Sequence, residues 1–190
     1  MHHPHCKHNK GTVSYLESPE RRKEFSPKQL LDMIPLNETD NILDFGAGTG
    51  YFSIPAAKRI LGNVYALDLN AKMLEIINEK AQKEQLTNII PVQGSMGELQ
   101  LPDGSIDKII ASLILHEIQP LAPLLQQMKN VLKKEGYLIC LELEPKESSE
   151  KAPRITLEEM EREMKDAGFQ VKEKFFPSQS LYMIIAQKMD

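Results

Sequence analysis

From residue 41 onward, short apolar runs alternate with longer segments whose apolar residues recur every three or four positions. Short runs rich in Ile, Val and Leu are typical of strands, and the longer period is typical of helices that bury one face. Asn70, for example, is placed to cap a helix whose buried face holds Met73, Leu74, Ile77 and Ala81. The predicted strands cover residues 41–45, 64–68, 89–93, 106–111 and 137–143.

Strands that alternate with helices of this length form right-handed crossovers, which produce a parallel sheet covered by helices on both faces. After a polar linker at 145–153, Thr156 and Glu159 have the spacing of a capping box, and their helix is expected to end at Gly168. Two β-rich runs, 169–176 and 181–187, follow and are expected to pair antiparallel because their link is short. The predicted fold class is therefore α/β, a seven-stranded, mostly parallel sheet with helices on both faces and a C-terminal antiparallel hairpin.

The first 40 residues do not share this alternation. Residues 1–17 are polar and rich in histidine, and Ser18-Pro19 and Ser26-Pro27 are each typical of a helix start. Gln29 completes a capping box at the second start. We expect residues 1–40 to form an N-terminal lid or helical extension and residues 41–190 to form the ligand-binding domain.

The composition is that of an ordinary globular protein and excludes several classes. Of 190 residues, 41% are hydrophobic and 26% charged, and the net charge of −4 argues against a protein that coats nucleic acid. The longest apolar run, 109–115, is far shorter than the roughly 20 residues that span a bilayer, and no apolar signal segment stands at the N-terminus. The two cysteines, Cys6 and Cys140, show no paired spacing, which is typical of a reducing compartment. We expect a cytoplasmic protein with no membrane or nucleic-acid partner.

The glycine-rich segment 46–50 follows the first predicted strand, at the point where open α/β sheets bind ligands. Glycine at 46, 48 and 50 allows the backbone to approach a ligand closely and to adopt positive φ. Asp68 ends the second predicted strand, where a carboxylate can accept both hydroxyls of a ribose. Together these features indicate a cofactor that contains adenosine, whereas the alternative is a tight turn followed by a helix-capping aspartate.

The spacing of the glycines separates two classes of cofactor. Dinucleotide sites use G-x-G-x-x-G and hold a pyrophosphate at the helix N-terminus, whereas this chain reads G-x-G-x-G. Asp44 lies two residues before the first glycine, where it disfavours an anionic pyrophosphate and favours a cationic ammonium or sulfonium. These charges favour S-adenosylmethionine.

Four segments resemble, in order, the sequence blocks of the class I S-adenosylmethionine-dependent methyltransferases, in particular the compact bacterial and archaeal members that act on small molecules. The segments are 43–50, 64–70, 101–117 and 131–142. The resemblance implies a Rossmann-like sheet and an enzyme that transfers a methyl group from S-adenosylmethionine to a small-molecule acceptor and releases S-adenosylhomocysteine.

The resemblance also implies which residues bind the cofactor. Asp68 is expected to hold the ribose and Leu69 to pack on the adenine. Ser95 and Met96 are expected near the adenine amino group, where many members carry Asp or Glu in place of this serine. Leu113, after the fourth strand, is expected to border the methyl group. The residues expected around the methionine part are Asp44, Gly46, Ala47, Gly48 and Gly50.

Methyl transfer depends on positioning and on exclusion of water, and it needs a base only when the acceptor must lose a proton. His116 is the candidate base, and the alternative is a histidine that bonds the loop backbone and shapes the pocket. Glu142 and Glu144, at the end of the fifth strand, face either the same cavity or solvent. Tyr15 is either part of a lid over the cofactor or an aromatic residue on a flexible tail.

The N-terminal histidines and cysteine are ligand-type residues, but no second cluster completes a closed site, so no metal is expected. No Pro-Pro-aromatic block follows the fourth strand, which argues against methylation of amino groups in nucleic acid or glutamine, and we expect a small, neutral or apolar acceptor. Two other functions stay open: an S-adenosylmethionine-binding sensor or partner subunit without transferase activity and, less favoured, a nicotinamide-dependent oxidoreductase. The sequence leaves the oligomeric state undetermined.

Overall fold

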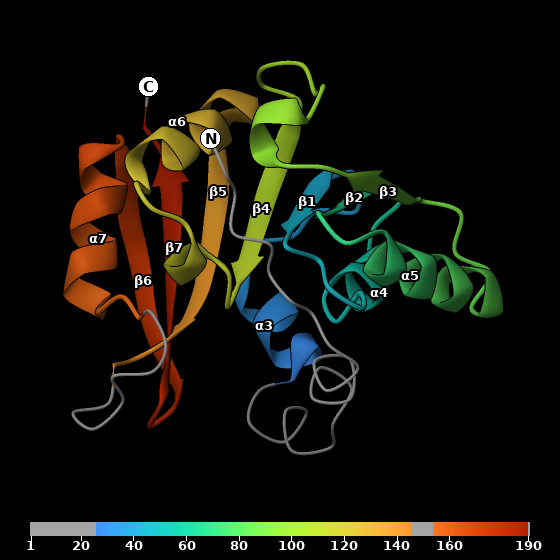
Figure 1. Cartoon of the computed structure of the whole chain (residues 1–190), viewed down its shortest axis with the longest axis horizontal. Coiled ribbons are helices and arrows are strands. Elements are labelled where there is room, and N and C mark those ends of the chain that lie inside the picture. The colour runs from blue at the N-terminus through green and yellow to red at the C-terminus, as the bar shows by residue number, and fades with distance from the viewer. Residues whose placement is uncertain (1–25, 146–153, 190) are drawn as a thin grey trace.

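The computed structural model describes residues 26–145 and 154–189, which form one seven-stranded sheet (Figure 1). The strands are β1 (Ile42–Phe45), β2 (Val64–Asp68), β3 (Ile89–Gln93), β4 (Ile106–Ser112), β5 (Leu132–Leu143), β6 (Phe169–Ser178) and β7 (Leu181–Lys188). Their order is β3-β2-β1-β4-β5-β7-β6; the first five pair in parallel, and β7 is antiparallel to both β5 and β6. The predicted α/β fold class and the closing hairpin are confirmed.

The helices are α3 (Pro27–Met33), α4 (Ser53–Ala57), α5 (Ala71–Lys83), α6 (Ala122–Val131) and α7 (Leu157–Asp166), with single 3₁₀ turns η1 (Met96–Glu98) and η2 (Leu115–Glu117). Their starts follow the capping residues. The side chain of Asn70 accepts from the backbone N–H of Lys72, and the predicted capping boxes form at the starts of α3 and α7. The other predicted helix start, Ser18-Pro19, lies outside the described residues.

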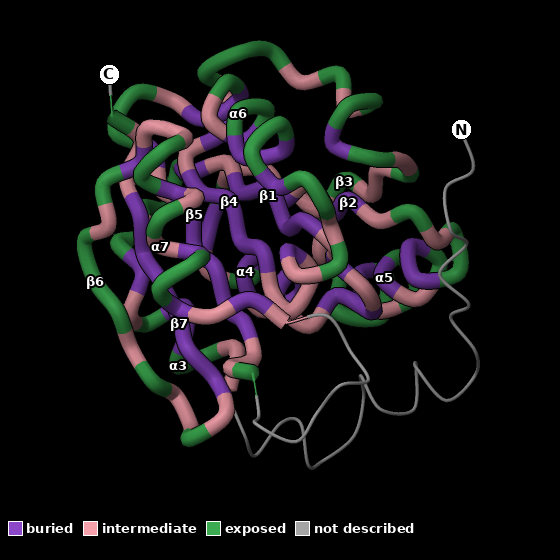
Figure 2. The backbone as a smooth tube through the Cα atoms, turned by 60° about the vertical axis from the view of Figure 1, so that its left-hand side comes forward, coloured by how far each residue is buried: buried purple, intermediate pink, exposed green. Residues whose placement is uncertain are grey.

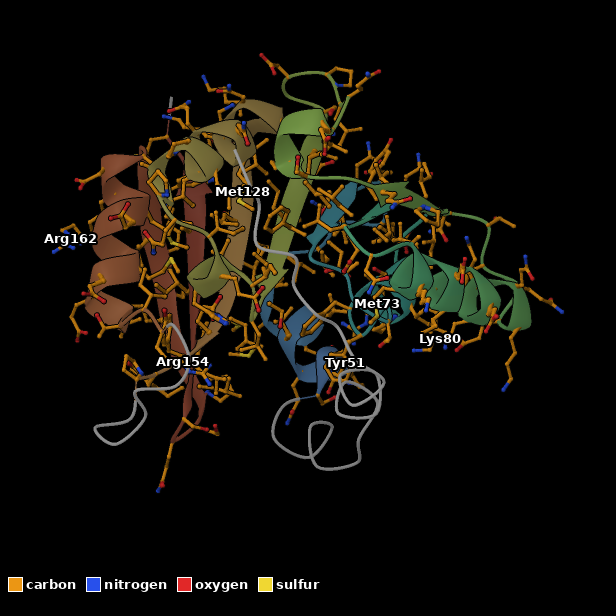
Figure 3. All side chains as sticks on the ribbon, viewed as in Figure 1. Tyr51, Met73, Lys80, Met128, Arg154 and Arg162 are labelled. Atoms are coloured by element: carbon orange, nitrogen blue, oxygen red, sulfur yellow. The ribbon has the colours of Figure 1, made fainter. Side chains whose placement is uncertain are left out.

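Helices cover both faces of the sheet. Helices α6 and α7 pack on one face, where Met128 of α6 is fully buried. Helices α3 and α4 pack on the other, and α5 joins them beside β2 through Ile77. Because strand side chains alternate, Ile109 of β4 faces the first layer and Ile110 the second. Figure 2 shows the buried central strands beside the largely exposed edge strand β6, and Figure 3 labels Met128 on the inside and Arg162 on the outside of the molecule.

Two predicted elements differ in length. The helix expected to run from the glycine turn to about residue 61 ends at Ala57, because the side-chain amide of Asn88 donates to the carbonyl oxygens of Ala57, Ile60 and Gly62 in place of helical bonds. Strand β5 begins five residues earlier than expected, directly after α6, where Leu132 pairs with Ile106. Among the described helices, none combines the length and the apolar character needed to cross a membrane.

Helix α3 belongs to the sheet core, although it lies within the predicted N-terminal extension. Leu30, Leu31 and Ile34 are buried together with residues of β1 and β4. At the amino end of these strands, Lys108 forms a buried ion pair with Asp40 (Nζ to Oδ2, 3.1 Å). The division of the chain at residue 40 stays a prediction.

Candidate functional site

The glycine turn joins β1 to α4 at the carboxyl ends of the parallel strands. Gly46, Gly48 and Gly50 have φ values of 72°, 54° and 81°, which other residues rarely adopt. The backbone N–H groups of Gly46 and Ala47 both donate to the carbonyl oxygen of Leu67 on β2, at 2.9 and 3.0 Å. The turn is therefore fixed against the neighbouring strand by bonds that no side chain supplies.

The carboxylate of Asp68 connects the turn to helix α5. Its Oδ2 accepts from the N–H of Gly48 and its Oδ1 from the N–H of Asn70, both at 2.8 Å. The structural role that the sequence left as an alternative is therefore present. A carboxylate offers about four acceptor positions, so two positions are left for ribose hydroxyls and the two roles are compatible.

A second carboxylate, Asp44, is buried on β1 just before the turn, with 2% of its surface exposed. Its Oδ2 accepts from the hydroxyl of Ser53 at 2.5 Å. On the other side of the turn, Lys80 of α5 donates from Nζ to the carbonyl oxygen of Thr49 at 2.7 Å (Figure 3). An acidic group at this position suits a cationic ligand better than a pyrophosphate.

The predicted adenine side lies after β2 and β3. Leu69 is 70% exposed, which leaves an apolar surface beside the site. Met96 is buried, whereas Ser95 is exposed and its N–H and hydroxyl both donate to Oε2 of Glu98 at 2.8 Å. Glu98 was missed from the sequence, and the signal that identifies it is the Ser-x-x-Glu spacing of a capping box. The carboxylate of Glu98 therefore lies beside Ser95, the position at which many members of the family carry Asp or Glu.

The segment after β4 packs on the glycine turn. Leu113 has a φ of 56°, which is strained for a leucine, and its N–H donates to the carbonyl oxygen of Leu141. A Cβ placed on Gly46 would lie 2.9 Å from Cγ1 of Ile114, so this side chain sits directly on the turn. At the end of β4, the Oγ of Ser112 is buried and has no hydrogen-bond partner among the described residues.

Glu142 holds this segment from β5. The residue is fully buried, and its Oε1 accepts from the N–H groups of Ile114 and Leu115 at 3.0 and 2.8 Å. Its Oε2 lies 2.6 Å from Nδ1 of His116. The solvent-facing alternative is wrong for Glu142, because the loop supplies the donors that satisfy the buried carboxylate. Glu144 points elsewhere and accepts from the N–H of Leu157 at the start of α7.

The remaining predicted residues are placed as follows. Cys140 is fully buried, and burial, together with the nearby charge of Glu142, raises the pKa of its thiol well above the usual range. Tyr15 and the N-terminal histidine cluster lie outside the described residues. Within residues 26–145 and 154–189, no three His, Cys, Asp or Glu side chains form a group that could hold a metal ion.

The donor set of this site fits S-adenosylmethionine. Asp44 and Asp68 supply carboxylates for an ammonium group and for ribose hydroxyls, and Leu69 supplies an apolar surface for adenine. The hydroxyl of Ser112 is a buried polar group whose partner is not found within the described chain. A pyrophosphate at the turn would instead meet the buried carboxylate of Asp44 on β1.

Comparisons with known proteins agree with this fold. A family model described as a methyltransferase domain matches residues 43–140. The demethylmenaquinone methyltransferase of Listeria welshimeri is 31% identical over 117 residues, which are 60% of this chain and 50% of that protein. The chain therefore spans about half the length of the curated relatives it matches.

Solved structures share the fold. A SAM-dependent methyltransferase from Aquifex aeolicus superposes with a TM-score of 0.86 and 24% identity, over 96% of this chain and 100% of that one. The [4+2]-cyclase SpnF superposes with a TM-score of 0.81 and 14% identity, over 90% of this chain and 82% of that one. At these identities the likeness shows the fold alone.

Proposed function

The chain belongs to the class I S-adenosylmethionine-dependent methyltransferases, and from this premise we propose that it methylates a small molecule of little or no charge. The observation that carries the proposal is the glycine turn bound to Asp68 through Gly48, with the carboxylate of Asp44 buried before it. S-Adenosylmethionine, when bound, supplies a methyl group on a sulfonium that is activated for displacement.

The residues of the chain bind and orient the cofactor and the acceptor. Asp68 accepts the ribose hydroxyls, Leu69 covers the adenine, and Ser95 and Met96 border its edge. Leu113 bounds the space where the acceptor meets the methyl group. The residues assigned to the methionine part are Asp44, Gly46, Ala47, Gly48 and Gly50. We further propose that the part of the N-terminal extension (residues 1–40) that precedes α3 closes over the site, with Tyr15 as part of the lid. We also propose that the protein works in the cytoplasm, since its cysteines are unpaired in sequence.

The relatives give a first acceptor to test. Their name, demethylmenaquinone methyltransferase, describes proteins that act on a quinone, a class of largely apolar ring compounds whose reduced, hydroquinone form carries phenolic hydroxyls. This chain covers only half of those proteins, so a quinone acceptor is a proposal for it. SpnF, named a [4+2]-cyclase, has the same fold, which is a reason to test the reaction itself as well as binding.

Thermal unfolding with S-adenosylhomocysteine, S-adenosylmethionine, NAD and NADP in parallel tests the proposal. A ligand at about 100 times its dissociation constant adds about 2.7 kcal/mol of stability, or roughly 5–10 °C in the midpoint for a chain of this size. We expect this shift with the first two ligands in the wild type and in Asp103→Asn, a matched control at an exposed turn, and its loss in Asp68→Asn. A shift with the nicotinamide nucleotides alone would overturn the proposal and favour the oxidoreductase alternative.

A further inference from the structure

A buried carboxylate and a histidine meet beside the proposed methyl-transfer site. Oε2 of Glu142 lies 2.6 Å from Nδ1 of His116, and the two side chains are 0% and 11% exposed. Contacts of this length between a carboxylate and a ring nitrogen are charge-assisted hydrogen bonds, about twice as strong as neutral ones. The pair links β5 to the loop after β4, two segments that are 26 residues apart in the sequence.

The surrounding bonds assign the proton on the imidazole ring. Oε1 of Glu142 accepts from two backbone N–H groups, and a carboxylate accepts hydrogen bonds but cannot donate them, so a Glu142 carboxylate places the shared proton on Nδ1. The neutral ring then carries a lone pair at Nε2. Oε1 of Glu117 is 4.0 Å from Nε2, beyond hydrogen-bond distance. Nε2 is therefore able to accept a proton.

The loop that carries His116 lies on the cofactor turn. Ile114, two residues earlier, packs so closely on Gly46 that a Cβ there would lie within 2.9 Å of its side chain. The bonds from Glu142 to the N–H groups of Ile114 and Leu115 hold the loop in this place. The histidine is thus fixed near the carboxyl ends of β1 and β4, where the acceptor is expected.

We propose that Glu142 and His116 form a proton-accepting pair and that the methyl acceptor carries an ionisable hydroxyl, phenolic or enolic. This inference rests on the proposed methyltransferase function. The hydroxyl proton moves to Nε2 of His116 as the acceptor attacks the methyl carbon; the carbon–sulfur bond breaks, and its electron pair stays on sulfur. The imidazolium that forms is stabilised by the charge of Glu142, which stays ionised, and later releases its proton to solvent.

The charges around the pair favour an acceptor that arrives neutral. Glu117 on the loop and Glu142 on β5 face the ring, whereas the carboxylate of Glu144, just after β5, bonds the start of α7. Among the described residues near Glu142, the Cys140 thiol and the Tyr182 hydroxyl are uncharged, since burial raises the pKa of both. A carboxylate or phosphate on the acceptor would be repelled here. A neutral hydroxyl compound binds without this cost but must lose its proton to react as an oxyanion, and this loss requires a base.

A purely structural role for Glu142, as an anchor for the loop, makes a different prediction. Glu142→Gln keeps an oxygen for the N–H groups of Ile114 and Leu115, but its amide donates to Nδ1 and so moves the ring proton to Nε2. His116→Asn keeps an N–H toward Glu142 and lacks Nε2. Both variants should therefore preserve the loop while removing the base. Glu144→Gln, just past the end of the same strand, is the matched control because the carboxylate of Glu144 bonds α7 instead.

The first test reads the proton on His116 directly. In the full-length protein labelled with ¹⁵N-histidine, two-bond ¹H–¹⁵N spectra near neutral pH distinguish the two tautomers, and His116→Asn assigns the signal. We expect protonated Nδ1 in the wild type and in Glu144→Gln, and protonated Nε2 in Glu142→Gln. A wild-type ring protonated at Nε2, or an unchanged tautomer in Glu142→Gln, would overturn the proposal that Glu142 and His116 form a proton-accepting pair. Because this measurement requires neither cofactor nor acceptor, its outcome does not depend on the proposed function.

The second test compares 1-naphthol with 1-naphthylamine, which differ only in the acceptor atom. Mass spectrometry follows the methylated product and S-adenosylhomocysteine. We expect 1-naphthol to be preferred, with kcat lowered about 10²–10⁴-fold in Glu142→Gln and His116→Asn but unchanged in Glu144→Gln. Preference for the amine, or turnover of neither compound while S-adenosylhomocysteine still stabilises the protein, would overturn the hydroxyl assignment. Failure of S-adenosylhomocysteine to stabilise the wild type would instead refute the proposed function.

Discussion

Replacing Gly46 by alanine tests how tightly the loop after β4 packs on the glycine turn. The added Cβ meets two constraints. The φ of 72° strains any residue with a Cβ by about 1–2 kcal/mol. The Cβ would also lie 2.9 Å from Cγ1 and 3.2 Å from Cβ of Ile114, closer than ordinary contact. Glu142 holds the backbone N–H of Ile114, so the side chain has little freedom to withdraw.

Gly104 provides the matched control. Its φ of 65° is nearly the same, but a Cβ there would meet nothing within 4 Å. In Gly104→Ala only the backbone strain lowers the free energy of unfolding. Alanine also restricts the unfolded chain, which offsets about 0.4–1 kcal/mol of this strain, so we expect the free energy of unfolding to fall by about 1 kcal/mol. Gly46→Ala adds an overpacking cost of about 1–3 kcal/mol, which gives a total of about 2–4 kcal/mol.

Urea unfolding of the two variants and the wild type measures these free energies, provided that the slopes with urea stay equal. Adding Ile114→Ala to Gly46→Ala should recover part of the loss, because the two closest atoms other than Cβ are removed. Equal destabilisation by Gly46→Ala and Gly104→Ala would contradict this prediction, since it would mean that Ile114 does not pack closely on the turn.

Three further predictions concern stability. Asp40→Asn or Lys108→Met alone leaves an unpaired buried charge and should lower the free energy of unfolding by about 3–5 kcal/mol, whereas the double variant should lower it much less. Urea unfolding of the three variants measures these differences. Glu135→Gly relieves an exposed residue with a φ of 62° and should raise the unfolding free energy by about 0.5–1 kcal/mol in the same assay. The backbone and side chain of Thr156 lower the pKa of Glu159 from its usual value of 4.5, so this carboxylate stabilises the fold above that pH. The stability difference between the wild type and Glu159→Gln should therefore be present at pH 6 and disappear as the pH falls through the lowered pKa; a difference that is constant with pH would contradict it.

Much of the fold follows from local patterns in the sequence. The apolar run at 64–68 gives β2 with the bounds that the structure shows, and the period that follows Asn70 gives the start and the buried face of α5. These patterns are sufficient because a doubly covered sheet requires apolar strands and one-sided helices. The glycine turn is equally local, since positive φ at 46, 48 and 50 favours glycine whatever lies nearby.

The rest of the site depends on contacts between distant segments. Whether Glu142 faces solvent or the loop is decided by donors about 26–28 residues earlier in the chain, which no periodicity along β5 reveals. The early end of α4 similarly depends on Asn88, which lies more than 20 residues beyond that helix. Asp68 was predicted for its chemistry, and its bond to the N–H of Asn70 is local, but its bond to the N–H of Gly48 forms only once β2 lies beside the turn.

A crystal structure of the protein grown with S-adenosylhomocysteine would show directly whether the glycine turn binds this cofactor. We expect ribose hydroxyls within hydrogen-bond distance of the Asp68 carboxylate, adenine against Leu69, and the amino-acid end of the ligand beside Gly46 and Asp44. A ligand bound elsewhere, or a purine that contacts neither Asp68 nor Leu69, would contradict the site and the methyltransferase mechanism built on it.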